Sequence, residues 1–192
     1  MVRNVNLENS SMSKSLIFVR KDSGIRTVKD MAGKRMAFVD RATIKGYLFA
    51  INFLKENGIS NIDKFFKEYY FTGSYDSAIY SVLDRRADIG ISKSNIYNKF
   101  IEKIPGAKDE LTIIAESRDF PDTIFCLRKD FPVDVKKRIK DVLLNMHNDL
   151  EGKKVLERYK AKNFIEVTKD DFAPSLELLT KAGVNLKTYK YK

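Results

Sequence analysis

The stretch Met36-Ala-Phe-Val-Asp-Arg-Ala-Thr-Ile-Lys-Gly-Tyr47 decides how this chain folds. Met36–Val39 is a short apolar run, which predicts a buried strand, and Asp40–Thr43 is a polar turn. Beyond the turn, apolar residues recur at the spacing of an amphipathic helix, at Ile44, Tyr47, Leu48, Ile51 and Leu54. Asn57-Gly58 then supplies a helix stop. A strand therefore enters a helix through a tight turn.

The start of this helix is a candidate anion site. Its first amides lack intrahelical partners and lie at the positive end of the helix dipole. Thr43 adds a hydroxyl group and Lys45 adds a charge. Most helix caps bind nothing, so geometry alone favours the alternative, in which Thr43 is an ordinary N-cap.

The composition describes a soluble globular protein. The 192 residues suffice for one substantial core or two small lobes, and 43% of them are hydrophobic and 32% charged. No apolar run approaches the roughly 20 residues that span a membrane. Residues 1–14 contain no apolar segment of a signal peptide, so either such a segment precedes this sequence or the protein is cytoplasmic.

The formal net charge of +10 favours anionic partners, from small anions to nucleic acid. The basic residues are scattered among acidic ones, as in 102–110 and 153–162, and no nucleic-acid-binding motif is present. A lysine-rich solvated surface is therefore the favoured interpretation. A basic nucleic-acid-binding protein is a distant alternative, which salt-dependent retention of DNA would support.

No set of residues in the sequence suggests catalysis. His147 is the only histidine, and it lies beside polar residues on a predicted helix. Cys126 is the only cysteine and sits in an apolar run, which is typical of a small core residue. Metal-ligand spacings and a nucleophile elbow are absent from the sequence. We therefore expect a protein that is not an enzyme and needs no cofactor.

Strands and helices alternate along the chain, which predicts an α/β fold with a largely parallel sheet covered on both faces. We expect a flexible N-terminus over residues 1–14. The predicted strands are 15–19, 36–39, 66–71, 87–91, 111–115 and 123–127. The predicted helices are 27–32, 44–56, one that follows Ser74 as its cap, 93–104, 133–147, 150–160 and 169–182.

Two strands share one pattern. Leu16-Ile-Phe-Val-Arg-Lys-Asp22 and Ile124-Phe-Cys-Leu-Arg-Lys-Asp130 each place four apolar residues before Arg-Lys-Asp. The echo suggests two equivalent hinge strands that bracket one lobe. We therefore predict that residues 15–20 and 123–128 run side by side.

The order of these features resembles the phosphate/phosphonate/phosphite ABC-transporter substrate-binding proteins, which have a type II periplasmic-binding-protein fold. The matching pieces are Ser15–Ile25, Asp30–Asp40, Gly46-Tyr47, Leu54–Ile59, Phe71–Asp76, Val82–Asp88 and Ile114–Ser117. The resemblance covers most of residues 14–182 and implies an α/β ligand-binding lobe at 15–128 with a hinge strand at each end. Residues 129–192 would be a C-terminal helical segment of the other lobe, whose N-terminal part this sequence lacks.

The resemblance also implies where a ligand binds. In the family a hydroxyl-rich turn and backbone amides hold phosphoryl oxygens. Thr43 falls on the first hydroxyl position, Gly46 on the glycine, with Tyr47 after it, while Ile44 and Lys45 replace two hydroxyl residues. The loss of these two hydroxyl donors weakens the hydrogen bonding of an anion at the turn. The positive charge of Lys45 restores part of the attraction for the anion.

Four further positions complete the implied site. Ser74 precedes Tyr75, which stands where the family usually has histidine, and Asn95 aligns with an acidic residue. Asp122 is the candidate aspartate of the cleft. The resemblance thus implies a periplasmic or extracytoplasmic protein that binds a small oxyanion of the phosphonate, phosphate or phosphite class without catalysis. It also implies an ABC transporter permease as partner. A ligand-sensing input module, or a truncated remnant with altered or lost binding, is the alternative.

The C-terminal helices would lack their usual sheet partner. Several of their apolar residues would then stay exposed, namely Val135, Ile139, Val142, Leu143, Leu176 and Leu179. Soluble monomers seldom expose a large apolar patch, so we expect a homo-oligomer that associates through this region.

Overall fold

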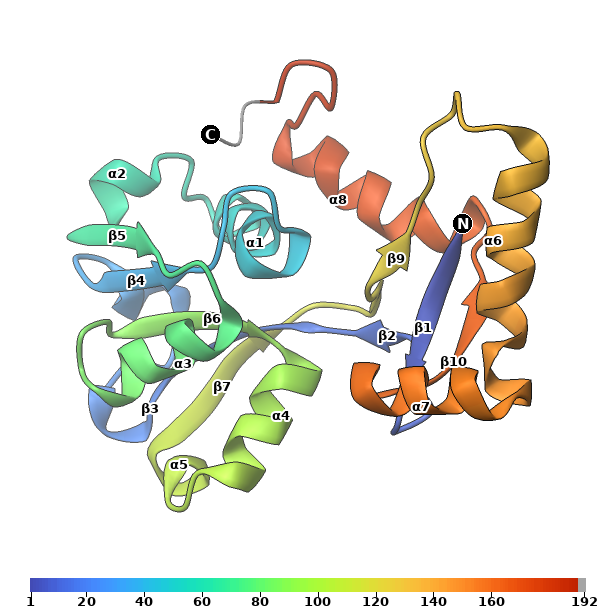
Figure 1. Ribbon diagram of the computed structural model, residues 1–192. Coiled ribbons are helices and arrows are strands. Elements are labelled where there is room, and N and C mark those ends of the chain that lie inside the picture. The colour runs from blue at the N-terminus through green and yellow to red at the C-terminus, as the bar shows by residue number, and fades with distance from the viewer. Residues whose placement is uncertain (190–192) are drawn as a thin grey trace. The chain divides into compact units, whose positions relative to one another are not determined.

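The structure is a computed structural model that describes residues 1–189, and its contacts divide the chain into two units. Unit 1 contains Met1–Ser13 and Phe120–Pro174. Unit 2 contains Lys14–Asp119 and the residues from Ser175 onward. The chain therefore passes from one unit to the other three times (Figure 1).

Unit 2 is built on a five-stranded sheet in the order β5-β4-β6-β3-β7. The strands are β3 (Ser15–Arg20), β4 (Arg35–Phe38), β5 (Glu68–Phe71), β6 (Ile89–Lys93) and β7 (Leu111–Glu116). Strand β4 pairs in parallel with both β5 and β6, whereas β3 is antiparallel to β6 and to β7. The sheet is therefore mixed, and our expectation of a largely parallel sheet holds only for its β5-β4-β6 half.

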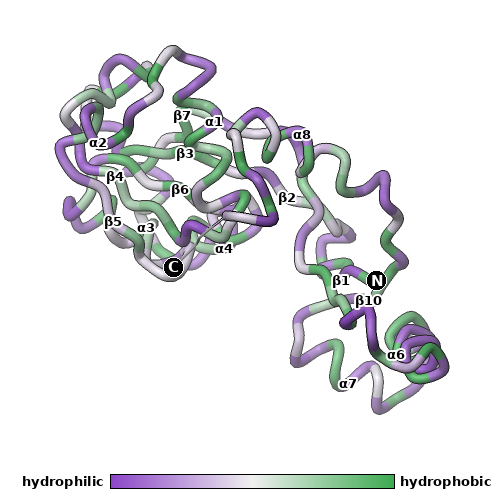
Figure 2. The backbone as a smooth tube through the Cα atoms, turned by 90° about the horizontal axis from the view of Figure 1, so that it is seen from above, coloured by the Kyte–Doolittle hydropathy of each residue, from purple (hydrophilic) through white to green (hydrophobic). Residues whose placement is uncertain are grey.

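Helices cover both faces of this sheet. They are α1 (Phe49–Glu56), α2 (Ile62–Phe65), α3 (Tyr75–Leu83), α4 (Ser94–Lys103) and α5 (Ala107–Glu110). Figure 2 shows α1 and α2 on one side of the strands and α3 and α4 on the other. Because side chains alternate along a strand, Leu16 and Phe18 join the core under α3 and α4 while Ile17 and Val19 face the opposite side, and all four are buried.

Unit 1 contains a three-stranded antiparallel sheet in the order β10-β1-β9. Its strands are β1 (Val2–Asn6), β9 (Ile124–Phe125) and β10 (Ala161–Glu166), and β2 (Met12–Ser13) pairs separately with β8 (Phe120–Pro121). Helices α6 (Val133–Asn145) and α7 (Leu150–Tyr159) accompany the sheet, and α8 (Ala173–Ala182) leads the chain out of this unit. Val2, Leu156, Ala161 and Phe164 form the small core.

Three expectations for this unit differ from the structure. Residues 1–14, expected to be flexible, contain β1, which is the central strand of the sheet. Strand β10 follows α7, where no strand was expected. The strand expected at 123–127 is reduced to the two residues of β9, because only β1 pairs with it.

The predicted pairing of residues 15–20 with 123–128 is wrong. Strand β3 pairs with β6 and β7, whereas β9 pairs with β1 in a different sheet. The repeated Arg-Lys-Asp instead encodes a local ion pair at the end of each run. Arg20 Nε lies 3.1 Å from Asp22 Oδ1, and Arg128 Nη2 lies 2.8 Å from Asp130 Oδ2. The echo therefore reflects similar turns and not adjacent strands.

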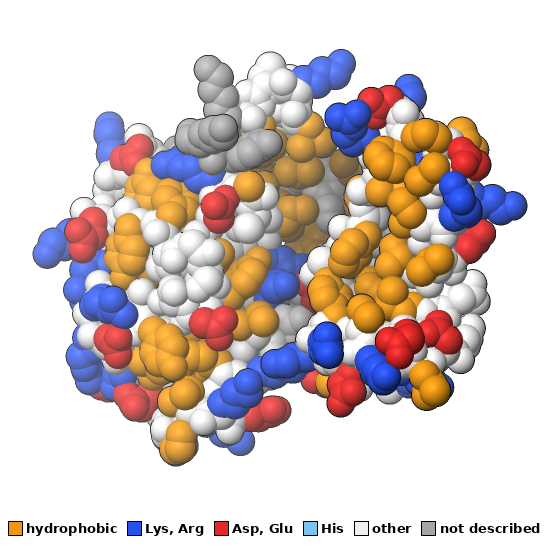
Figure 3. Space-filling model, viewed as in Figure 1, with side chains coloured by type: hydrophobic (Ala, Val, Ile, Leu, Met, Phe, Trp, Pro, Cys, Tyr) orange, Lys and Arg blue, Asp and Glu red, His pale blue; other side chains and the backbone are white. Residues whose placement is uncertain are grey.

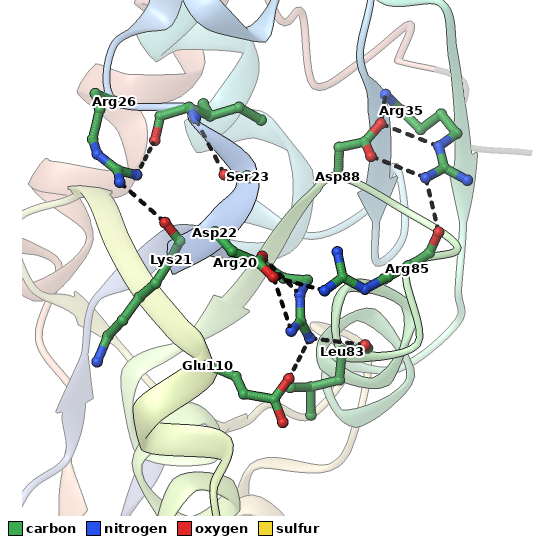
Figure 4. A network of polar contacts seen from close by, with 11 residues as sticks. Arg20, Lys21, Asp22, Ser23, Arg26, Arg35, Leu83, Arg85, Asp88 and Glu110 are labelled. Carbon is green, nitrogen blue, oxygen red and sulfur yellow. Dashed lines mark hydrogen bonds and ion pairs between the residues drawn. The ribbon is translucent and has the colours of Figure 1, made fainter.

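A network of hydrogen bonds and ion pairs stabilises the edge of the unit 2 sheet at which β4 begins (Figure 4). Arg35 donates from its backbone amide and its guanidinium to Asp88, at 2.8 to 3.1 Å, and also to the carbonyl of Arg85. Arg20 contacts Glu110 at 2.5 Å and donates to the carbonyl of Leu83. The hydrogen bonds from the Arg35 guanidinium hold the pKa of Asp88 below its usual value.

We expect Asp88→Asn to destabilise the protein by about 1–2 kcal/mol at pH 7, because it removes charge-assisted hydrogen bonds. Because the pKa of Asp88 is lowered in the folded protein, its carboxylate stabilises the fold fully at a pH above the unfolded-state pKa. This stabilisation is lost as the pH falls through the folded-state pKa. The difference between variant and wild type in urea denaturation should therefore shrink below about pH 4.

The control for this experiment is Asp84→Asn, because Asp84 forms an exposed pair with Arg86. We expect it to cost under about 0.5 kcal/mol. Equal costs for the two variants, or a cost for Asp88→Asn that does not change with pH, would contradict the structural role assigned to Asp88.

Candidate functional site

The candidate site lies at the edge of the unit 2 sheet where β4, β5 and β6 end. The three strands are parallel, so their carboxyl ends meet at one edge. Residues 39–47 follow β4, residues 72–75 follow β5, and residues 94–95 follow β6. Ligands of open α/β sheets bind outside such carboxyl ends. The structure thus brings eight of the nine predicted site residues to one edge.

The turn after β4 is held by its own polar groups. The carbonyl of Asp40 accepts from the Thr43 amide at 3.1 Å and from the Thr43 hydroxyl at 2.6 Å. The Asp40 carboxylate accepts from the Ala42 amide at 2.7 Å. Thr43 occupies the N-cap position, but its hydroxyl caps no helical amide. The turn is therefore fixed before the helix begins.

The helix opens with a wide π-helical turn over Ile44–Leu48 and continues as α1. Its first backbone bonds run from the Leu48 amide to the Thr43 carbonyl, at 3.1 Å, and from the Phe49 amide to the Ile44 carbonyl. The amides of residues 44–47 precede these bonds, as the first amides of a helix do. These four amides are the ones on which the predicted anion site depends.

Gly46 is required by close packing. A Cβ atom at this position would lie 2.6 Å from Val39 Cβ and 2.6 Å from Thr43 Oγ1. The Gly46 carbonyl also accepts from the Val39 amide at 3.0 Å. Only glycine lets the helix start approach the end of β4 this closely.

Lys45 is 5% exposed, although lysine is rarely buried. Its carbonyl accepts from the hydroxyl of Ser15 at 2.6 Å, and the Ser15 amide donates to Ser117 Oγ at 2.8 Å. Ser15 is fully buried. Neither Ser15 nor Ser117 was predicted to be part of the site. The signal that the sequence offered was the position of Ser15 at the start of an apolar strand.

Tyr47 has a packing role. Its ring meets Phe38 edge-on at 5.0 Å and lies 5.5 Å from Phe71, and the Arg41 guanidinium lies over the Phe71 ring at 4.7 Å. Burial raises the pKa of the Tyr47 phenol. Tyr47 thus anchors the helix start in an aromatic cluster.

The remaining predicted residues occupy two places. Ser74 caps α3, because its hydroxyl accepts a hydrogen bond from the Ser77 amide at 3.1 Å. The Lys93 ammonium lies over the Tyr75 ring, 5.2 Å from the ring centre. Asn95 is the second residue of α4, and its amide oxygen is buried. Asp122 belongs to unit 1, where its amide donates to the Ser11 carbonyl.

Two kinds of feature are absent from residues 1–189. In this range, no three or more His, Cys, Asp and Glu side chains gather closely enough to hold a metal ion. No helix in the same part of the chain has the length and apolar character needed to cross a membrane.

Comparison with known proteins identifies the family. The family of periplasmic substrate-binding proteins of phosphonate ABC transporters matches residues 1–172. The chain belongs to this family. Its members are substrate-binding components of transporters and are periplasmic.

Solved structures agree on the fold. A binding-protein component of an ABC phosphonate transporter from Pseudomonas aeruginosa has a TM-score of 0.79 at 21% identity, over 94% of this chain and 61% of that one. PhnD1 from Prochlorococcus marinus in complex with methylphosphonate has a TM-score of 0.74 at 21% identity, over 95% and 71%. XAC2383 from Xanthomonas citri bound to ATP has a TM-score of 0.76 at 20% identity, over 95% and 71%.

We expect Gly46→Ala to lower the free energy of unfolding by about 1–3 kcal/mol, because the added methyl group overpacks the contact with Val39 and Thr43. The amide NMR signals of residues 43–47 should shift with it. The control is Gly24→Ala, since Gly24 has a φ of +74° and a Cβ atom added there would meet no other atom within 4 Å. Gly24→Ala should destabilise through backbone strain and leave those signals in place. An unchanged stability in Gly46→Ala would contradict the packing argument.

Proposed function

We propose that the chain binds a small oxyanion of the phosphonate, phosphate or phosphite class, without chemical turnover, as the substrate-binding component of an ABC transporter. The observation that carries this proposal is the turn from Asp40 to Gly46, because it starts a helix at the edge where three parallel strands end. Membership of the phosphonate-binding family supports it.

The proposed ligand contacts are the amides of residues 44–47, with Lys45 as the source of positive charge. Ser74, Tyr75 and Asn95 would line the same edge, and Asp122 stays a prediction from the family resemblance. Each charge-assisted hydrogen bond to an oxyanion contributes roughly 1.5–3 kcal/mol before desolvation is subtracted. Amides serve this purpose well because they carry fixed dipoles and need no reorganisation.

The hydroxyl groups of the site favour weak binding. Thr43 already donates its hydroxyl proton to the Asp40 carbonyl, and Ser74 donates its own to Ser77 Oγ at 2.8 Å. A hydroxyl has one proton, so each must break a bond before it can donate to a ligand. This observation supports the second candidate function, a sensing module or remnant of the family with altered or lost binding. For the first candidate, we therefore expect a dissociation constant of about millimolar or weaker.

We expect titration with methylphosphonate, phosphate or sulfate to shift the amide NMR signals of residues 43–47. Lys45→Met should weaken this binding at least tenfold, because it removes the charge and keeps most of the length of the side chain. Lys45→Glu should abolish the binding, since a carboxylate would repel the anion.

The matched control is Lys64→Met, a neutral replacement of an exposed lysine on α2, which should leave the titration unchanged. Shifts confined to other basic surfaces, or equal affinities in wild type and Lys45→Met, would leave the turn as an ordinary helix cap. The second candidate function would then stand.

A further inference from the structure

The carbonyl of Lys45 receives a hydrogen bond from a side chain on a different strand. Ser15, the first residue of β3, donates its hydroxyl proton to this carbonyl over 2.6 Å, although it lies 30 positions earlier in the sequence. The exposed fraction is 0% for Ser15 and 5% for Lys45. Burying a hydroxyl group costs free energy unless it is hydrogen-bonded, so this bond accounts for a serine at a fully buried position.

Ser15 is itself held in place by Ser117, the residue that follows β7. The Ser15 amide donates to Ser117 Oγ at 2.8 Å, and the Ser15 carbonyl accepts from the Ser117 amide at 2.9 Å. Ser117 is also buried and donates its own hydroxyl proton to the Arg118 carbonyl at 2.6 Å. Both backbone polar groups of Ser15 are therefore bonded, which fixes the point from which its hydroxyl reaches Lys45.

The bond to the Lys45 carbonyl also fixes the direction of the Gly46 amide. A peptide unit is planar and almost always trans, so its C=O and the N–H of the next residue point in opposite directions. Cis peptide bonds are absent from the part of the chain that the structure describes. Because the Lys45 C=O points towards Ser15, the Gly46 N–H points away from it. The Gly46 amide is one of the amides proposed to hold the oxyanion.

The next peptide unit is fixed in the same way, but by a backbone group. The Gly46 carbonyl accepts from the Val39 amide at 3.0 Å, so the Tyr47 N–H points away from Val39. The two neighbouring amides therefore differ in what directs them, because a main-chain donor acts on Tyr47 and a single side-chain hydroxyl acts on Gly46. A substitution of Ser15 can change the Gly46 amide and leave the Tyr47 amide as an internal reference.

We propose that Ser15 is a positioning residue of the oxyanion site, whose hydroxyl directs the Gly46 amide towards the bound anion. This inference rests on the proposed function, because it assigns the residue that orients one of the proposed contacts. Ser15 does not bind the anion itself, since its one hydroxyl proton is donated to Lys45. A donor that is held in place before the anion arrives loses no conformational freedom on binding, so its orientation raises the affinity.

The test needs a signal that is specific to the helix start. Figure 3 shows Lys and Arg side chains spread over the visible face of the molecule, interspersed with Asp and Glu. The formal net charge of the chain is +10. A concentrated anion therefore also contacts other surfaces, and a change in total binding would not identify the site. The direction and the chemical shift of individual amides identify it.

The first measurement uses the whole chain without an anion and records the residual dipolar coupling of each N–H bond, which reports the direction of the bond. In Ser15→Ala the coupling of Gly46 should change, whereas that of Tyr47 should keep its wild-type value. Ser15→Cys should give an intermediate result, because a thiol is a weak donor. The matched control is Ser92→Ala, which removes an equally buried hydroxyl from the neighbouring strand β6 and should change neither coupling.

The second measurement titrates the same variants with methylphosphonate and follows the amide signals of residues 43–47. Ser15→Ala should weaken the binding about fivefold, which is the effect of one typical hydrogen bond. Ser92→Ala should bind as the wild type does. Urea denaturation of both alanine variants shows that each is folded during the titration, so a general loss of stability does not explain a lower affinity.

Three results would overturn the proposal. They are an unchanged Gly46 coupling in Ser15→Ala, equal changes of this coupling in Ser15→Ala and Ser92→Ala, and a changed coupling with an unchanged affinity for methylphosphonate. A wild-type protein without shifts at residues 43–47 would overturn the proposed function. In that case the couplings recorded without anion still support or refute the direction that Ser15 gives to the Gly46 amide.

Discussion

The parallel pairing of β4 with β5 on one side and β6 on the other is the constraint on which the candidate site depends. It sends three strand ends to one edge, and the chain must leave each end by a turn into a helix or a loop. The turn after β4 is closely packed, because Gly46 lies against Val39 and leaves no space for a side chain. The position of the helix-start amides follows from that contact.

The same edge also shows how few mobile donors the site has. The Thr43 and Ser74 hydroxyls serve the local structure, Tyr47 is packed among aromatic rings, and Ser15 holds the Lys45 carbonyl. The proposed ligand contacts at this edge are therefore mainly backbone amides. Backbone donors select for negative charge and geometry more than for the identity of an anion. We therefore expect a site that distinguishes oxyanions poorly.

The fold was predicted best where local sequence and tertiary pairing agree. The strand, turn and helix from Met36 to Leu54 could be predicted because periodicity and the Asn57-Gly58 stop act over neighbouring residues. The repeated Arg-Lys-Asp pattern led to the wrong prediction that residues 15–20 and 123–128 pair. A local ion pair and a shared strand partner can produce the same sequence pattern. Strand β10 was missed because its sequence, Ala-Lys-Asn-Phe-Ile-Glu, has neither an apolar run nor strict apolar alternation. It pairs only with β1, which is distant in the sequence. Pairing across such a separation leaves no local signal.

In the site, too, residues with a local sequence signal could be predicted, and residues that depend on a distant contact could not. Thr43 to Tyr47 could be found from the turn itself, whereas the contribution of Ser15 depends on a hydrogen bond to a residue 30 positions further along the chain. A crystal structure of the protein soaked in concentrated methylphosphonate would show whether an oxyanion binds at the start of the helix that follows β4. We predict density for a tetrahedral anion within hydrogen-bond distance of the amides of residues 44–47. Density for the anion only at other basic surfaces, with this turn unoccupied at saturating ligand, would contradict binding of the anion by these amides.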